Sequence, residues 1–351
     1  MAHEPRAQHI AVISHHRSGG GTPLDSLWYS REALREHGLE LSFHWALSPR
    51  CLVAAARPGY FLFDGVHALA PVWSQRLQTL LALRRAPVAL YWHETEFQLR
   101  QVRQSHWLRR ALSRGNLFHF HVCKYGLAML ERELAIPQGR LCQLTNCAAE
   151  VRLPASSATA PPDAPVVAGC GTASERKGTD LFLQTCALVS QSIPKASFVW
   201  IGETGEGNFA APRLAERARE LGIADRTTFT GPREDATALI ARASVFFLSS
   251  RDDPMPKVLM ESLALGKDIA AFGVGGVPEL LGKHGTIVPP QDCTAAARAI
   301  VEMLRAPASD AERAAMRATY REQYTTAAFA GRFAGAFNAW KHATASSGKL
   351  D

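Results

Sequence analysis

Residues 245–262 read VFFLSSRDDPMPKVLMES and make up one strand–loop–helix unit. The apolar run Val245–Leu248 is typical of a buried strand. Two prolines follow it, and because proline suits only the first turn of a helix, we expect the helix to begin near Pro256. Asp253 then lies in the loop just ahead of this helix, and Glu261 about a turn and a half inside it. Two carboxylates beside a helix N-terminus suit a ligand with hydroxyl groups and phosphates.

The same alternation of strand and helix runs along the chain in two series. The expected strands of the first series are Ile10–Ser14, Leu41–Trp45, Tyr60–Phe63, Val88–Trp92, Leu117–Val122 and Leu141–Thr145. Those of the second are Val166–Cys170, Phe198–Ile201, Thr227–Thr230, Val245–Leu248, Ile269–Phe272 and Thr286–Val288. One helix is expected from about Pro23 to His37, and helix dominates from Gln291 to about His342. Such alternation predicts an α/β fold: two doubly wound, Rossmann-like domains, with parallel sheets and a ligand crevice between the domains at the carboxyl ends of the strands.

Length and composition agree with two globular domains. The chain has 351 residues, of which 47% are hydrophobic and 20% charged, so disorder is not indicated. The Pro/Ala/Ser-rich segment 154–162 is the one obvious linker, and we expect domains at 1–160 and 161–325, with a helix and tail at 326–351. The first residues form no apolar signal region, and no apolar run approaches eighteen residues. Seven cysteines make no metal-binding spacing, so we expect buried, reduced thiols in a cytoplasmic protein.

Charge is uneven along the chain. Residues 1–163 have a net formal charge of +6, and residues 164–351 of +1. A basic first half favours an acidic partner, such as an anionic membrane surface, a lipid diphosphate or an anionic glycan, although a generally arginine-rich composition explains it equally well. Residues 99–114 form a basic amphipathic stretch suited to anionic headgroups or simply to solvent. Its aromatic residues are too few to indicate nucleic-acid binding.

The loop after the first strand of the second series has the character of a phosphate site. Residues 169–178 read GCGTASERKG and open a helix. The cations Arg176 and Lys177, together with the free N–H groups of that helix, suit a diphosphate. A solvated surface loop is the alternative reading. Two further glycine sites follow later strands, at Gly202 and at Gly275 with Gly276, where the backbone can approach a ligand closely or simply turn.

Two segments of the first series are also candidates. Residues 14–22 read SHHRSGGGT and include Gly19, Gly20 and Gly21, but they do not form the GxGxxG pattern of dinucleotide sites. His93 ends a predicted buried strand, which is the right place for a crevice residue. A lone histidine at a strand end also commonly has a structural role.

Taken in this order and spacing, these segments resemble the retaining GT-B glycosyltransferases, especially the GT4-like group 1 family, whose signature is two acidic residues separated by seven others. The resemblance is strongest over residues 170–289. It implies that Glu261 accepts hydrogen bonds from the ribose and that Asp253 holds hydroxyls of the donor sugar. Lys177 would neutralise the departing diphosphate, and His93 would contact the sugar near the reacting carbon.

The resemblance extends to backbone sites. Gly231 and Arg233 stand where family members hold the nucleotide base through main-chain groups, and residues 19–21 correspond to a loop that faces the donor phosphates and the acceptor. The last helix of the fold crosses back to the first domain. Because the base is held by the backbone, its identity cannot be read from the side chains.

The chain departs from the family pattern at two positions. The first acidic residue is usually Glu, whereas Asp253 is one methylene shorter, which alters its reach and could change the sugar accepted. The family's usual arginine is replaced by Thr172, so the role of second phosphate ligand falls on Arg176 and is open. A metal-binding pair of the GT-A type at Asp252 and Asp253 is disfavoured, because the pair comes late, inside the second doubly wound domain.

The expected function is that of a retaining, metal-independent hexosyltransferase-type enzyme. It would move a sugar from a nucleoside diphosphate sugar, used as co-substrate without any cofactor, to a glycan or lipid-linked acceptor in surface polysaccharide or glycolipid synthesis. We expect a cytoplasmic location, with peripheral contact at the inner face of an anionic membrane and no nucleic-acid partner. Two alternatives stay open: a non-catalytic GT-B subunit that binds nucleotide sugars, and a GT-B sugar-nucleotide 2-epimerase.

Overall fold

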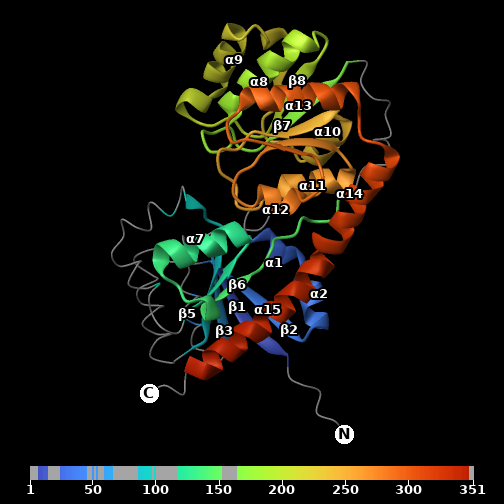
Figure 1. The fold of residues 1–351 in the computed structure, drawn as a ribbon. Helices are drawn as coiled ribbons and strands as arrows, with labels where there is room; N and C mark the ends of the chain where they lie inside the picture. Colours follow the sequence, from blue (N-terminus) through green and yellow to red (C-terminus); the bar gives the residue numbers. More distant parts are fainter. Residues whose placement is uncertain are drawn as a thin grey trace. The chain divides into compact units, whose positions relative to one another are not determined.

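The structure is a computed structural model that describes residues 7–14, 24–45, 50, 53, 59–65, 86–96, 99, 112, 117–151 and 164–347. It forms two compact units (Figure 1). Unit 1 takes Met1–Ala149 together with Gln323–Asp351, and unit 2 takes Glu150–Glu322.

Unit 1 is built on a six-stranded parallel sheet in the order β2-β1-β3-β4-β5-β6. Its strands are β1 (Gln8–Ser14), β2 (Leu39–Trp45), β3 (Tyr60–Asp64), β4 (Val88–Trp92), β5 (Leu117–His121) and β6 (Leu141–Gln143). The central strands are almost completely buried, as expected of a parallel sheet that is covered on both faces.

Two sets of helices cover this sheet. The described helices of unit 1 are α1 (Asp25–Tyr29), α2 (Arg31–Glu36), α7 (Lys124–Leu134), the 3-10 turn η2 (Gln138–Arg140) and α15 (Thr326–Ser347). Phe61 and Phe63 pack in one cluster with Met129 of α7, whereas Tyr60 stacks edge-on against Trp340 of α15. Since side chains alternate along a strand, α7 and α15 cover opposite faces of the sheet.

Unit 2 repeats the architecture with a second six-stranded parallel sheet, in the order β12-β11-β10-β7-β8-β9. Its strands are β7 (Val166–Cys170), β8 (Ser197–Ile201), β9 (Thr227–Phe229), β10 (Val245–Leu248), β11 (Asp268–Phe272) and β12 (Thr286–Val288). Its helices are α8 (Thr179–Ser192), η4 (Gly207–Phe209), α9 (Ala211–Glu220), η5 (Ala224–Arg226), α10 (Ala236–Arg242), α11 (Lys257–Leu265), α12 (Val277–Leu281), α13 (Cys293–Arg305) and α14 (Asp310–Gln323). Figure 1 shows α8, α9 and α13 on one side of the sheet and α10, α11 and α12 on the other.

The structure confirms all twelve predicted strands and the predicted start of α11, for which Pro256 is the N-cap residue. The single helix expected from 23 to 37 is wrong. The chain forms α1 and α2 there, and the backbone breaks at Ser30, whose side chain is buried and lies 3.6 Å from the thiol of Cys147. A contact with a residue far along the chain has overridden local helix preference.

The cysteines of the described segments are free thiols. Three of them, Cys123, Cys147 and Cys186, are buried as expected, whereas Cys142, Cys170 and Cys293 are only partly so. Cys170 is the last residue of β7.

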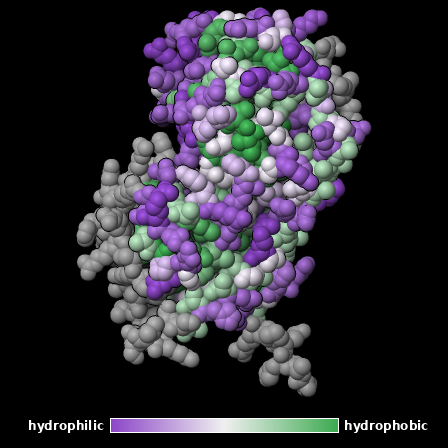
Figure 2. Space-filling view, viewed as in Figure 1, coloured by the Kyte–Doolittle hydropathy of each residue, from purple (hydrophilic) through white to green (hydrophobic). Residues whose placement is uncertain are grey.

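Polar side chains dominate the visible surface of both units in Figure 2. Large apolar side chains that are exposed in the described segments are scattered, and they are Tyr29, Trp45, Val53, Tyr125 and Ile287. Among the described helices, none is both long and apolar enough to span a membrane.

Candidate functional site

The order of the strands in unit 2 creates a natural ligand position. From β7 the chain proceeds through β8 to β9 on one side, whereas β10 leads to β11 and β12 on the other. The loops that leave β7 and β10 therefore diverge at a topological switch point, where doubly wound sheets bind ligands. These two loops contain the predicted residues Lys177 and Asp253.

The structure brings Lys177 and Asp253 into direct contact. Lys177 donates from Nζ to Oδ2 of Asp253 over 2.6 Å, and the two side chains are 18% and 5% exposed. Nη1 of Arg176 lies 3.9 Å from the same carboxylate oxygen, and the hydroxyl of Ser250 lies 3.5 Å from it. One nearly buried carboxylate therefore has two cations beside it.

Arg176 is placed by a second contact as well. Its Nη1 donates to the backbone carbonyl of Asp252 over 3.2 Å, which directs the guanidinium across the gap between the two loops. Arg176, the candidate for the role of the family arginine, thus lies beside the same carboxylate as Lys177.

Glu261 belongs to the same neighbourhood, although it lies on α11. Burial raises the pKa of the Cys170 thiol to about 12, the negative charge of Glu261 adds to this rise, and the positive charge of Lys177 opposes it. The charges of Glu261 and Lys177 therefore both act on the Cys170 thiol at the end of β7. The lysine and the second acidic residue, which are 84 positions apart in the sequence, both lie close enough to this thiol to influence its pKa.

The predicted glycines lie around these side chains. Gly202 and Gly231 form an isolated bridge at the ends of β8 and β9, and the Gly202 amide donates to the Gly231 carbonyl over 3.1 Å. Gly275 has a φ of +51°, and a Cβ there would lie 2.1 Å from the Asp253 carbonyl oxygen. Only glycine allows such an approach. The amide of Gly276 donates to the same carbonyl over 3.3 Å.

Arg233 occupies a different setting. It forms a bidentate, half-exposed ion pair with Asp235, with distances of 2.7 and 2.8 Å, just beyond Gly231. The pair with Asp235 raises the pKa of its guanidinium. The backbone at Gly231 is therefore near the strand ends, while the Arg233 side chain is held by a neighbour on the surface.

In unit 1, His93 is held by a buried carboxylate. Its Nε2 lies 3.0 Å from Oδ1 of Asp64, whose Oδ2 accepts a 3.0 Å hydrogen bond from Ser14. Because a carboxylate only accepts, Nε2 carries the proton of this contact. The ring also lies against Tyr91, with centroids 4.2 Å apart. Asp64 ends β3 and Ser14 ends β1, which are the strands at the switch point of this sheet.

Asp64 and Ser14 were not predicted from the sequence. Asp64 directly follows a predicted buried strand, and a carboxylate at that position is a signal that could have identified it. Asn146 follows the last strand of the unit 1 sheet, and its Oδ1 accepts hydrogen bonds from the Tyr91 hydroxyl over 2.8 Å and from the Ser26 hydroxyl over 3.3 Å. The predicted loop Gly19, Gly20 and Gly21 lies outside the described residues, as does most of the basic stretch 99–114.

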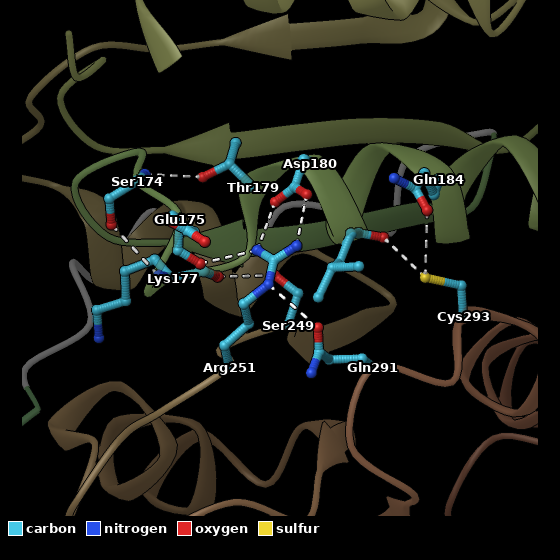
Figure 3. Close-up of polar contacts among 11 residues, drawn as sticks. Ser174, Glu175, Lys177, Thr179, Asp180, Gln184, Ser249, Arg251, Gln291 and Cys293 are labelled. Carbon is cyan, nitrogen blue, oxygen red and sulfur yellow. Dashed lines mark hydrogen bonds and ion pairs between the residues drawn. The ribbon is translucent and has the colours of Figure 1, made fainter. Parts of the chain in front are cut away.

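Arg251 is a third residue that sequence reasoning missed. Figure 3 shows its guanidinium between the Asp180 carboxylate and the Gln291 side chain, beside the loop that contains Lys177. The two carboxylate contacts measure 2.8 and 2.6 Å.

The segment that contains this cluster is similar to known glycosyltransferases. Residues 164–306 match the family model "Glycosyl transferases group 1". The chain is 30% identical over 146 residues to the lipopolysaccharide core biosynthesis glycosyltransferase LpsE of Rhizobium meliloti, a match that covers 41% of each chain. It is 33% identical over 176 residues to the D-inositol 3-phosphate glycosyltransferase of Mycolicibacterium paratuberculosis, covering 47% of this chain and 39% of the relative. These matches therefore span about four-tenths of the relatives' length.

The fold comparison covers more of the chain. The crystal structure of Anabaena HepE in complex with UDP superposes with a TM-score of 0.76 at 16% identity, and covers 94% of this chain and all of that one. The described strands and helices thus follow the GT-B architecture, and the segment 164–306 is similar to the group 1 glycosyl transferases.

Proposed function

We propose that this protein transfers a sugar from a nucleoside diphosphate sugar to an acceptor hydroxyl, with retention of anomeric configuration and without a bound metal. The observation that supports this most directly is the cluster at the switch point of unit 2. There Lys177 and Arg176 lie within 4.0 Å of one nearly buried carboxylate, and the charge of Glu261 reaches the same edge of the sheet. Such a cluster offers cations for a diphosphate and acceptors for hydroxyl groups.

Lys177 and Arg176 take the diphosphate in this proposal. As the bond between the anomeric carbon and the phosphate oxygen breaks, negative charge builds up on that oxygen, and fixed cations stabilise it. The acceptor oxygen forms a new bond to the same carbon on the same face. Its proton passes to the departing phosphate oxygen, so no side-chain nucleophile is required.

The carboxylates orient the donor. Glu261 accepts from the ribose hydroxyls, and Asp253 accepts from hydroxyls of the sugar. Because Lys177 already neutralises Asp253 in the ligand-free protein, binding of a diphosphate gives this lysine a second anionic partner. The backbone at Gly202, Gly231, Gly275 and Gly276 supports the nucleotide and the sugar, and the surface pair of Arg233 lies at the rim of that region.

His93 is the proposed contact with the sugar from unit 1. Asp64 and Ser14 fix its ring, so the proton on Nε2 is committed to the carboxylate and Nδ1 is left to accept. The loop Gly19 to Gly21 is proposed to face the donor phosphates and the acceptor.

UDP is the first nucleotide to test, because HepE was crystallised with UDP and with UDP-glucose. For the acceptor we propose an anionic glycan or a lipid-linked glycan, in surface polysaccharide or glycolipid synthesis. The net charge of +6 on residues 1–163 supports an anionic acceptor or peripheral contact with an anionic membrane.

The experiment is a thermal-shift panel of UDP, GDP, ADP and dTDP in the presence of EDTA, followed by turnover with the sugar nucleotides of whichever base binds. One nucleotide should raise the Tm of the wild type, and NMR of the product should show the anomeric configuration of the donor. Inversion, or activity that EDTA abolishes, would overturn the mechanism. Conversion of the donor without any acceptor would instead identify an epimerase, and binding without turnover a non-catalytic subunit.

A further inference from the structure

Two neighbouring loops of unit 2 contain the proposed donor residues. Residues 171–178 lead from β7 into α8 and contain Lys177, while residues 249–256 lead from β10 into α11 and contain Asp253. The distance between Lys177 and Asp253 therefore depends on how these loops are held together. Several of the contacts that hold them together involve Arg251.

The Arg251 side chain binds three separate segments. Nη1 and Nη2 form the bidentate pair with Asp180, in the first turn of α8. Nη1 also donates to the backbone carbonyl of Glu175 over 2.8 Å, and Nε donates to Oε1 of Gln291 over 3.2 Å (Figure 3). Each polar edge of the guanidinium thus has a partner, and two of these partners, Glu175 and Asp180, flank Lys177 in the sequence.

The backbone of the same loop completes the connection. The Arg251 amide donates to the Arg176 carbonyl over 2.8 Å, and the Ser249 hydroxyl donates to the Lys177 carbonyl over 3.1 Å. The fit is close, because a Cβ on Gly178, which has a φ of +64°, would lie 1.9 Å from the Ser249 carbonyl oxygen. The main chain on both sides of Lys177 is therefore fixed by the loop that contains Asp253.

The Arg251–Asp180 pair is well suited to this task. Burial alone would raise the pKa of Asp180, but the hydrogen bonds and charge of Arg251, together with hydrogen bonds from the backbone at Asp180 and Leu181, outweigh it and hold that pKa below its ordinary value. The two side chains are 24% and 32% exposed, so water competes only partly with the pair. A lysine at this position would have neither the planar fork nor the additional N–H groups.

We propose that Arg251 is a positioning residue for the transfer reaction: by clasping Asp180 and the Glu175 carbonyl, it sets where Lys177 meets the diphosphate. The inference rests on the proposed function of Lys177. Arg251 itself acts through Lys177 and makes no contact with the reacting atoms in this proposal.

The chain offers a closely matched control in the same unit. Arg313 is also 24% exposed, pairs with Asp268 over 2.8 Å and donates to the backbone carbonyls of Ala308 and Gly266. It is a clasp of the same kind on α14, with no contact to either donor loop among those described. Substituting Arg313 therefore measures how the loss of an ion pair and its backbone hydrogen bonds affects stability alone.

The test compares Arg251→Gln, Asp180→Asn and Arg313→Gln with the wild type, each also combined with Lys177→Ala. The first readout is amide hydrogen exchange of the ligand-free protein over residues 174–178. The second is kcat and KM for the donor. We expect Arg251→Gln and Asp180→Asn to accelerate exchange in this loop and to lower kcat by about tenfold or more, since small misplacements of a catalytic group are costly. Arg313→Gln should do neither.

The double variants distinguish positioning from a general structural role. If Arg251 acts through Lys177, then Arg251→Gln should change kcat by less than about twofold once Lys177 is alanine, while the losses in Tm still add. Additive losses in kcat, or loop exchange that matches Arg313→Gln, would overturn the inference. A wild-type protein that binds no nucleotide and transfers no sugar would instead remove the proposed function, and this inference with it.

Discussion

Nζ of Lys177 lies 2.6 Å from Oδ2 of Asp253, and this contact joins the two loops that leave the switch point of the second sheet. The two charges are more than seventy positions apart in the sequence, yet each is the other's nearest ionic partner among the contacts described. The contact between Lys177 and Asp253 locates the candidate site more closely than either sequence motif does alone.

Removing one member of this pair should harm both folding and activity. Lys177→Met leaves the Asp253 carboxylate nearly buried, with Arg176 at 3.9 Å as its remaining cation, so we expect a loss of about 1–3 kcal/mol in the free energy of unfolding. Urea denaturation measures it. The double variant Lys177→Met/Asp253→Asn should recover most of that stability without recovering turnover. A double variant as unstable as the single one would show that the pair is not the cause.

Glu261 and Asp253 should differ in their kinetic signatures. Glu261→Ala is expected to weaken nucleotide binding by about tenfold or more, because the ribose hydroxyls lose a charged acceptor. Asp253→Ala should mainly lower kcat. Calorimetric titration with the nucleotide and steady-state kinetics separate the two effects, and Glu302→Ala, on the exposed face of α13, is the control. If both variants kept full affinity and turnover, these site assignments would be wrong.

Stability should fall in mild acid because two histidines of β5 are buried. Burial lowers the pKa of His119 to about 3 and that of His121 to about 4. As the pH falls, the two histidines take up protons near pH 6.5 in the unfolded chain, well before they do so in the folded protein. What they contribute to the free energy of unfolding is therefore complete above pH 6.5 and is lost as the pH falls toward 4. Between pH 6 and 5 each histidine should add about 1.2 kcal/mol per pH unit to the slope.

His119→Asn tests this slope. Nδ1 of His119 accepts from Nε1 of Trp92 over 3.0 Å, and an asparagine oxygen can take that bond without titrating. The unfolding free energy of the variant should depend on pH less steeply than that of the wild type. The difference in slope should equal the contribution of one titrating histidine. An unchanged slope would mean that His119 stays neutral in both states or is protonated in both.

Two helical glycines should respond to alanine in opposite directions. In α7, a Cβ on Gly126 would lie 1.7 Å from Cε1 of His121, so Gly126→Ala should cost about 2 kcal/mol or more despite the better helix propensity of alanine. In α15, a Cβ on Gly335 would meet nothing within 4 Å, and Gly335→Ala should stabilise by about 0.5–1 kcal/mol. Thermal unfolding measures both, and a gain from Gly126→Ala would contradict the close packing of the His121 ring.

Local patterns in the sequence were enough to place every strand of the described segments and the start of α11, because buried parallel strands are short apolar runs with clear ends. They could not reveal Arg251, since its partner Asp180 is defined only once β10 lies beside β7. The same holds for Asp64, which is recognised through His93 on the neighbouring strand. The break at Ser30 likewise depends on Cys147, a contact that no local window contains.

The return of α15 to unit 1 has a consequence for synthesis on the ribosome. Trp340 is completely buried and packs edge-on against Tyr60 and Phe120, so a central part of the first unit's core comes from near the end of the chain. Translation of the residues between takes roughly 10–30 s at ordinary rates. During that time Tyr60 and Phe120 of the nascent first unit lack their partner Trp340, while the second unit, whose residues are continuous, has all of its own sequence available first. Chaperone dependence should therefore concentrate on the half of the protein that is made earliest.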